Sequence, residues 1–413
     1  MGHLSGTSIS INLNTSNNQH EWTFTPIKGA TLIVNNHFGG NLGDERKHLR
    51  QILEVFRGYF PNKAERFEDW GKISMAVNLL ESFGQGMGER LFGYHEWGYV
   101  KHFFRKQLQQ SLREDEPFLV EVITPPAGIT PIEFLPVFAE GKKPSTIRNA
   151  MDLEAAMRQF PAFSAVVRRV VLTGHPYERD NIIEAYPRLP LKLFYHAGLK
   201  GALKEKAFFE KMPMLELRGP WPIEDIPLDQ IVETLADHLL DPSKKFQGRG
   251  ACPPDQIQHF ACHCDTSGPS SLEHSITLAH APKADRRVRI GELEEKIGRR
   301  AGWMKKKDAG VSPLIFLNAC GSNAMTPMDS TSFLGLFHHI SRGMIGTEAL
   351  VPDQFAAAFS ESFYRYLIKH ESLGKSIQQA RLDMLRRHYI PLGILYTLYA
   401  DSDIRVGNRR VRK

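Results

Sequence analysis

From residue 118 onward, short apolar segments alternate with amphipathic helical patterns, and this alternation is what most constrains the fold. Helices are expected at residues 227–240 and 353–368, where apolar side chains recur at helical spacing. The apolar segments are residues 118–123, 166–172, 214–217, 257–262, 314–317, 344–346 and 394–399. Short, continuously apolar strands that alternate with helices indicate a mostly parallel sheet covered on both faces. We therefore predict an α/β fold with a mostly parallel sheet flanked by helices.

The first 114 residues have a different pattern and are predicted to form an accessory region. Residues 8–13 alternate apolar and polar side chains, residues 14–19 are polar, and residues 22–24 resume β-type side chains, which indicates a β-hairpin. From about residue 44 to 108 the pattern is helical. The glycine-rich segment 84–88 interrupts it and is interpreted as a flexible helix break, because it lacks the strand and spacing of a dinucleotide-binding loop.

Composition excludes several classes of protein. The chain has 413 residues, 42% of them hydrophobic, with only four Cys, so an extensive core is expected and a disulfide scaffold is not. It contains neither an apolar run of the ~18–20 residues that would span a bilayer nor a secretory signal pattern, which predicts a cytoplasmic protein without membrane insertion.

The net charge of +6 is concentrated at the C-terminal end of the sequence. Five basic side chains and no acidic one lie in the last nine residues, and the rest of the chain is near neutral; they are Arg405, Arg409, Arg410, Arg412 and Lys413. A solvated, frayed tail over residues 406–413 is the favoured interpretation, and direct nucleic-acid binding is the weaker alternative.

Two of the predicted strands end in small and polar residues that include a reactive side chain. His263 follows the strand at 257–262, and Cys320 follows the strand at 314–317. Functional groups gather at the carboxyl ends of parallel strands. A thiol needs a nearby base or imidazolium to ionise near neutral pH, and His titrates in that range. The two strand ends therefore suggest nucleophilic attack on a carbonyl by a Cys–His pair, although a structural Cys and a structural His also fit these patterns.

A zinc site is the rival interpretation of the first strand end. His259, Cys262, His263 and Cys264 lie within six residues and are all potential ligands. Alternation along a strand would place the two His on one face and the two Cys on the other, so the four side chains would not converge. We therefore expect no metal.

The sequence resembles the CHAT-domain peptidases, a caspase-like cysteine protease family related to separase. The likeness covers about residues 115–405 and follows the order of the family's motifs. The matching segments are residues 129–135, 170–172, 216–228, 259–264, 317–320, 343–353, 355–363 and 374–381. The resemblance implies a caspase-like fold with a non-catalytic half at 115–250 and a catalytic half at 251–405.

The resemblance also implies roles for individual residues. Cys320 corresponds to the nucleophile and His263 to the general acid–base, with no cofactor. The backbone N–H groups of Cys264 and Cys320 correspond to the oxyanion donors. The family usually has Gly immediately after the catalytic His, and this chain has Cys264. A side chain at that position motivates the alternative that the chain is a catalytically impaired scaffold that binds proteins.

Three acidic residues are predicted to bind substrate: Glu348, Asp353 and Asp265. An acidic side chain beside the site would select a basic residue of the substrate. Asp353 also fits as the cap of the helix that follows it, and Asp265 fits as a turn residue.

Members of this family are expected to act as regulated effectors, often in bacterial antiviral defence. The implied partners are a protein substrate, such as a gasdermin or another product of a neighbouring gene, and an activating protein or nucleoprotein.

Overall fold

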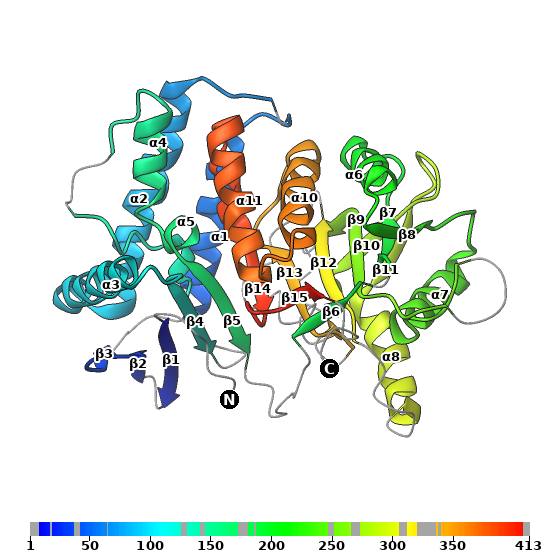
Figure 1. The fold of residues 1–413 in the computed structure, drawn as a ribbon, viewed down its shortest axis with the longest axis horizontal. Helices are drawn as coiled ribbons and strands as arrows, with labels where there is room; N and C mark the ends of the chain where they lie inside the picture. Colours follow the sequence, from blue (N-terminus) through cyan, green and yellow to red (C-terminus); the bar gives the residue numbers. More distant parts are fainter. Residues whose placement is uncertain are drawn as a thin grey trace.

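The computed structural model describes most of the chain, and its elements form two neighbouring sheets with helices packed against them (Figure 1). The described residues are 8–16, 19–36, 42–63, 65–124, 130–140, 145–171, 181–185, 187–246, 252–265, 273–304, 312–319, 336–337 and 340–407. Within these ranges, no helix has the length and apolar character required to cross a membrane.

The first sheet has five strands in the order β3-β2-β1-β4-β5. β1 (Ser8–Ser16), β2 (Gln19–Pro26) and β3 (Leu32–Asn36) form an antiparallel meander, as the alternation at residues 8–13 predicts for its first strands. β4 (Leu119–Thr124) runs parallel to β1, and β5 (Val166–Val171) runs parallel to β4. Hydrogen bonding is thus continuous across the predicted boundary between residues 114 and 115, because β1 pairs directly with β4.

The second sheet is the central one and has eight strands. Six of its strands pair in the order β11-β10-β9-β12-β13-β14. The other two are β7, which pairs with β9, and β8, which pairs with β7. The bounds are β7 (Leu189–Tyr195), β8 (Leu215–Trp221), β9 (Ile257–Asp265), β10 (Ser275–Leu278), β11 (Arg286–Arg289), β12 (Leu314–Ala319), β13 (Gly343–Thr347) and β14 (Tyr396–Ala400). β8, β7, β9, β12 and β13 are mutually parallel, and the remaining strands pair antiparallel at the edges. The mostly parallel sheet predicted from the sequence is confirmed.

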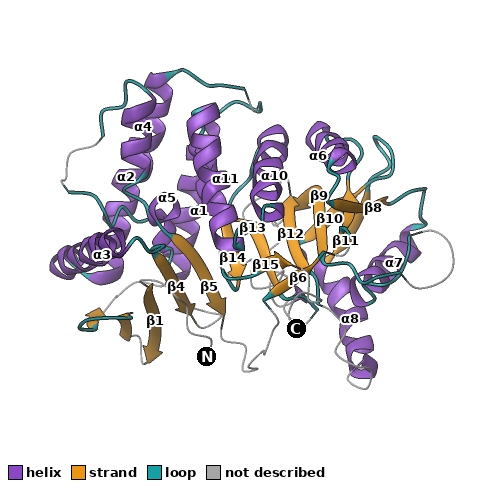
Figure 2. Cartoon of the chain, in the orientation of Figure 1, coloured by secondary structure: helices purple, strands orange, loops and turns teal. Residues whose placement is uncertain are grey.

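Helices cover both faces of this sheet (Figure 2). α6 (Lys200–Lys211), α10 (Asp353–Ile368) and α11 (Leu373–His388) lie on one side, and α7 (Leu228–Leu240) and α8 (Ile290–Met304) lie on the other. Around the first sheet lie α1 (Leu42–Gly58), α2 (Trp70–Phe92), α3 (Tyr94–Glu114), α4 (Ala150–Met157) and α5 (Pro161–Ser164). Short elements complete the fold: η1 (Ile132–Phe134), η3 (Pro391–Leu395), and the parallel pair β6 (Ile182–Glu184) and β15 (Arg405–Gly407).

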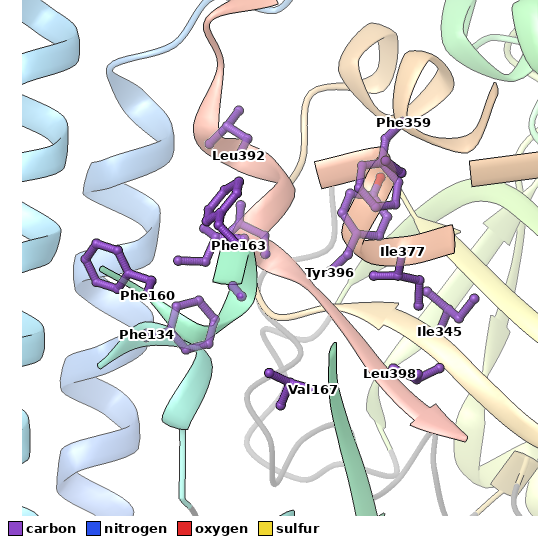
Figure 3. Packing of buried hydrophobic residues seen from close by; sticks show 14 of the residues in the cluster. Phe134, Phe160, Phe163, Val167, Ile345, Phe359, Ile377, Leu392, Tyr396 and Leu398 are labelled. Atoms are coloured by element: carbon purple, nitrogen blue, oxygen red, sulfur yellow. The ribbon is translucent and has the colours of Figure 1, made fainter. Parts of the chain in front are cut away.

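The hydrophobic core continues from one sheet to the other. One cluster of buried side chains includes Val167 of β5, Leu398 of β14 and Ile377 of α11, which lie near one another in Figure 3. In the same cluster, the rings of Phe359 and Tyr396 stack with their centroids 3.7 Å apart. A second cluster fills the opposite face of the central sheet, under α7 and α8. Because buried apolar area is the main favourable term in folding, the shared cluster ties the two sheets together.

The predicted helix break at residues 84–88 is wrong, because α2 continues through it. The glycines there serve close packing. A Cβ on Gly84 would lie 2.4 Å from the carbonyl oxygen of Phe134, and one on Gly88 would lie 2.6 Å from the ring of Trp97. Both are closer than any real Cβ contact, so neighbouring elements approach the helix where a side chain is missing.

Gly84→Ala is therefore expected to destabilise the protein by about 1–3 kcal/mol through overpacking, despite the better helix propensity of Ala. Gly86→Ala is the matched control. Its Cβ would meet only the Nη1 atom of Arg90, at 3.2 Å, and that side chain end can move. The control should leave stability unchanged or raise it by up to about 1 kcal/mol. The midpoints of urea unfolding compare the two variants, and equal midpoints would show that Gly84 is not a packing site.

Candidate active site

His263 lies near the carboxyl end of β9, at a corner where several strands meet. β12 runs parallel to β9 on one side, and β12's last residue, Ala319, aligns with Cys262. On the other side β7 pairs with β9 as far as Ala261, and β10 pairs with the last three residues of β9. Cys320 is the residue that follows Ala319, and it lies outside the described residues. The chain thus leaves β12 beside the residue that precedes His263.

Side chains alternate along β9 as the sequence predicts. Cys262 and Cys264 point into the cluster under α7 and α8, whereas Ile257 and Ala261 belong to the cluster on the other face, the face of His259 and His263. Cys262 and Cys264 are 0% and 1% exposed, and burial raises the pKa of both thiols well above the usual value. Both thiols stay protonated near neutral pH and do not supply a thiolate to the site.

His259 belongs to a buried hydrogen-bond network. Its Nε2 atom lies 2.6 Å from Oε2 of Glu205, and its Nδ1 atom lies 3.0 Å from the hydroxyl of Tyr364. All three side chains are buried. Among the residues that the structure describes, no group of three or more His, Cys, Asp and Glu side chains is arranged to hold a metal ion.

The same network fixes the end of β12. The Nδ2 atom of Asn318 donates to Glu205 and, at 3.1 Å, to the carbonyl oxygen of Ala356, while its Oδ1 atom accepts from the hydroxyl of Tyr396 at 2.6 Å. Asn318 is 1% exposed, so losing these partners would strand a buried amide. Asn318, two residues before Cys320, thereby connects β12 to helices α6 and α10. Sequence reasoning missed this network, and the one signal was a polar Asn within an apolar strand.

The backbone amide of Cys264 points toward β12. Ala261 accepts a hydrogen bond from His196 on the β7 side (2.9 Å), and Gln256 accepts one from Leu314 on the β12 side (2.9 Å). Successive residues of a strand direct their backbone groups to opposite neighbours, and Ala261 faces β7, so Cys262 and Cys264 face β12. The N–H of Cys264 thus points to the side of β9 on which β12 ends at Ala319.

A side chain that the sequence analysis did not single out contacts His263. The ring of His196, which directly follows β7, lies edge-on to the ring of His263 with the two centroids 4.7 Å apart. Nothing in the local sequence marks His196, because the contact depends on the pairing of β7 with β9.

All three predicted substrate-binding acids have partners within the protein. Asp265 is part of β9, so its interpretation as a turn residue is wrong, and it forms an ion pair with Arg287 of β11 at 2.9 Å. Asp353 does not cap its own helix, where Pro352 is the cap residue without a side-chain bond. Its Oδ2 atom instead accepts from the backbone N–H of Gly201 at 3.0 Å, in the first turn of α6. A carboxylate at a helix N-terminus is favourable.

Glu348, the third predicted acid, is 2% exposed and belongs to a buried charge cluster. Its Oε1 atom accepts from the hydroxyl of Tyr399 at 2.8 Å. Arg169 of β5 lies in the same cluster and forms a two-bond ion pair with Glu133, at 2.9 Å and 2.6 Å. Burial raises the pKa of Glu348 to about 7, and the charge of Glu133 adds to the rise while Arg169 opposes it.

Glu348→Gln is expected to change how stability depends on pH. In the wild type, folding favours the protonated carboxyl, so the free energy of unfolding falls as pH rises from about 4.5 to about 7. The shift corresponds to about 3 kcal/mol. A Gln side chain stays neutral, so the variant should match the wild type at pH 4.5 and exceed it by up to about 3 kcal/mol at pH 8. Urea unfolding at both pH values measures this, with the exposed Glu65→Gln as control; parallel pH profiles for Glu348→Gln and the wild type would contradict it.

Comparison with known proteins finds a family that is similar to this region. Residues 234–395 match the sequence model of the CHAT domain. Over these residues the chain is similar to CHAT domains. The matched segment runs from within α7 to η3 and includes His263, Cys320, Glu348 and Asp353, so the predicted resemblance is confirmed over a shorter range than residues 115–405.

Curated and solved relatives cover different parts of the chain. A protein of Vitiosangium sp. (strain GDMCC 1.1324), named a probable protease, is 30% identical over 104 residues, which are 24% of this chain and 14% of that protein. Two crystal structures of the Saccharomyces cerevisiae separase–securin complex, at 2.6 and 3.0 Å resolution, match with TM-scores of 0.48 and 0.47. Their sequence identities are 10% and 11%, and each match covers 95% of this chain and 30% of the solved one. The chain therefore spans only a small part of the relatives' length.

Proposed function

We propose that the chain is a cysteine endopeptidase in which Cys320 is the nucleophile and His263 is the general acid–base. The observation that carries the proposal is the register of β12 on β9, which ends with Ala319 beside Cys262. The residue after Ala319 is Cys320 and the residue after Cys262 is His263, the two residues that the proposed Cys–His pair requires. The CHAT match over both positions and the name of the Vitiosangium protein support the same reaction class.

The proposed reaction has two stages. His263 takes the proton of the Cys320 thiol, and the sulfur attacks the carbonyl carbon of the substrate peptide bond. The carbon–nitrogen bond then breaks as the imidazolium of His263 donates its proton to the leaving amine, which leaves a thioester on Cys320. Water, deprotonated by His263, attacks the thioester; the carbon–sulfur bond breaks, the acid product leaves, and the proton passes from His263 to the sulfur of Cys320. The amides of Cys264 and Cys320 would stabilise the oxyanion formed in each stage.

The direction of the Cys264 side chain favours an active enzyme over the scaffold alternative. That side chain points into the cluster opposite His263, so it does not occupy the space beside the imidazole. Cys264 also lies within the regular strand β9, and it is not among the described residues with positive φ. The replacement of the family's usual Gly therefore leaves the amide able to donate.

The substrate of the proposed enzyme is a protein. The side chain of Asp265 is 38% exposed, so a basic substrate residue would reach it by displacing Arg287. We further propose that residues 1–114 regulate the catalytic part. The family resemblance implies a cytoplasmic role in bacterial defence. The implied substrate is a gasdermin or another product of a neighbouring gene. The implied activator is a protein or a nucleoprotein.

The proposal is tested by incubating the full chain with the products of neighbouring genes, together with any activator among them, and mapping new protein N-termini by mass spectrometry. Cys320→Ala is the control. A set of cleavages that share a sequence preference and vanish in the control supports the endopeptidase. Cleavages that persist in Cys320→Ala would assign proteolysis to another residue or a contaminant.

A further inference from the structure

His196 is held in place by the backbone on both sides of it. Its N–H donates to Ala261 of β9 at 2.9 Å, and it forms a bridge with Ala279 beyond the end of β10. The N–H of the next residue, Ala197, donates to the carbonyl oxygen of Ala279 at 2.9 Å. His196 is 5% exposed, so this position, adjacent to His263, is both buried and fixed by the pairing of strands.

Both ring nitrogens of His196 have partners. Nδ1 accepts from the backbone N–H of Gly198 at 3.1 Å, so the proton of the neutral ring lies on Nε2, which is 3.0 Å from Oδ1 of Asp285. A Cβ on Gly198 would lie 2.9 Å from Cε1 of His196, which is closer than real contacts, so this turn requires glycine. Two hydrogen bonds at opposite sides of one imidazole fix both its tautomer and its orientation.

We propose that His196, held by Asp285 and Gly198, is a positioning residue that fixes the orientation of the His263 ring. The inference rests on the proposed role of His263 as general acid–base. His263 meets the edge-on ring of His196 at 4.7 Å, a favourable aromatic geometry. The imidazole of His263 cannot turn about its own axis without displacing the buried ring of His196. A ring held in one orientation presents each nitrogen to one set of partners, and those partners select its tautomer.

The test compares two substitutions at His196. His196→Ala removes the ring and frees that of His263, whereas His196→Phe keeps a ring that can pack edge-on. In His196→Ala, kcat should fall by about 10–100-fold while KM changes by less than about twofold, because a catalytic group displaced by an ångström costs on the order of 100-fold. His196→Phe should retain kcat within about threefold of the wild type. Loss of stability alone does not produce this split or this rescue.

A second readout needs no proteolysis. The nitrogen-15 shifts of the His263 ring, assigned with His263→Gln, report its tautomer. One tautomer should dominate in the wild type and in His196→Phe, and an averaged mixture should appear in His196→Ala. His238→Ala is the matched control, because His238 is 2% exposed, packs edge-on against Phe246 at 4.6 Å, and belongs to α7, on the sheet face opposite His263.

The outcomes separate the inference from the proposed function. Wild-type nitrogen shifts and kinetics in His196→Ala would overturn the positioning role while the protease stands. If the wild type cleaves no protein, the proposed function fails, and the nitrogen shifts still decide whether His196 orients His263. Mixed tautomers in His238→Ala would also overturn the inference, because the effect would then follow from general destabilisation.

Discussion

Replacing His263 with alanine should lower kcat/KM for proteolysis by about 10²–10⁴-fold, the range that general acid–base catalysis contributes. The loss should appear in kcat more than in KM, because the imidazole acts on the proton of Cys320 and on the leaving amine rather than on substrate binding. The fold should persist, since His263 is half-buried at a strand end and does not belong to either hydrophobic cluster.

Two further measurements sharpen this result. Added imidazole should restore part of the activity of His263→Ala, because a small base can enter the space that the side chain leaves. His370→Ala is the control, since His370 is exposed at the end of α10, where its Nδ1 atom lies 2.9 Å from the carbonyl oxygen of Val406. Equal rates for His263→Ala and His370→Ala would remove His263 from the mechanism.

Replacing Arg169 with methionine should lower the free energy of unfolding by about 3–5 kcal/mol, because it leaves the carboxylate of Glu133 buried without its cation. Glu133 is 0% exposed and its only described cationic partner at hydrogen-bond distance is Arg169, which contacts it through two bonds. The loss should diminish at low pH, where Glu133 in the variant takes up a proton.

The double variant Glu133→Gln with Arg169→Met separates the pair from its surroundings. It removes both charges, so most of the lost stability should return. Urea unfolding of the wild type, both single variants and the double variant gives the coupling free energy. A double variant as unstable as Arg169→Met alone would show that Arg169 stabilises the protein through another contact. Because β5 packs against β14, the pair lies where the two sheets meet.

The sequence predicted five strands of the central sheet because these strands are mostly apolar. The corresponding segments overlap β8, β9, β12, β13 and β14, and the other two of the seven segments overlap β4 and β5 of the first sheet. β7 was missed because Pro190 and Lys192 interrupt its apolar character, although all seven of its residues are buried. Lys192 is tolerated there because its ammonium lies 2.5 Å from the carboxylate of Asp255, a partner 63 residues along the chain. Long-range pairing of this kind leaves no local pattern.

The candidate site was predictable in part for the same reason. His263 and Cys320 each follow an apolar strand, and that local signal is visible in the sequence. Glu205 and Asn318 were not predictable as partners, because they are 113 residues apart and meet only when α6 packs on the central sheet. The contact of His196 with His263 likewise exists only through the pairing of β7 with β9.

The central claim is tested most directly by a peptide probe that carries a thiol-reactive group, with the labelled residue identified by mass spectrometry. We predict that the probe modifies Cys320, that His263→Ala slows this labelling strongly, and that the buried Cys262 and Cys264 stay unmodified. Labelling of Cys252 in place of Cys320, or labelling of Cys320 at the same rate in His263→Ala, would contradict the account.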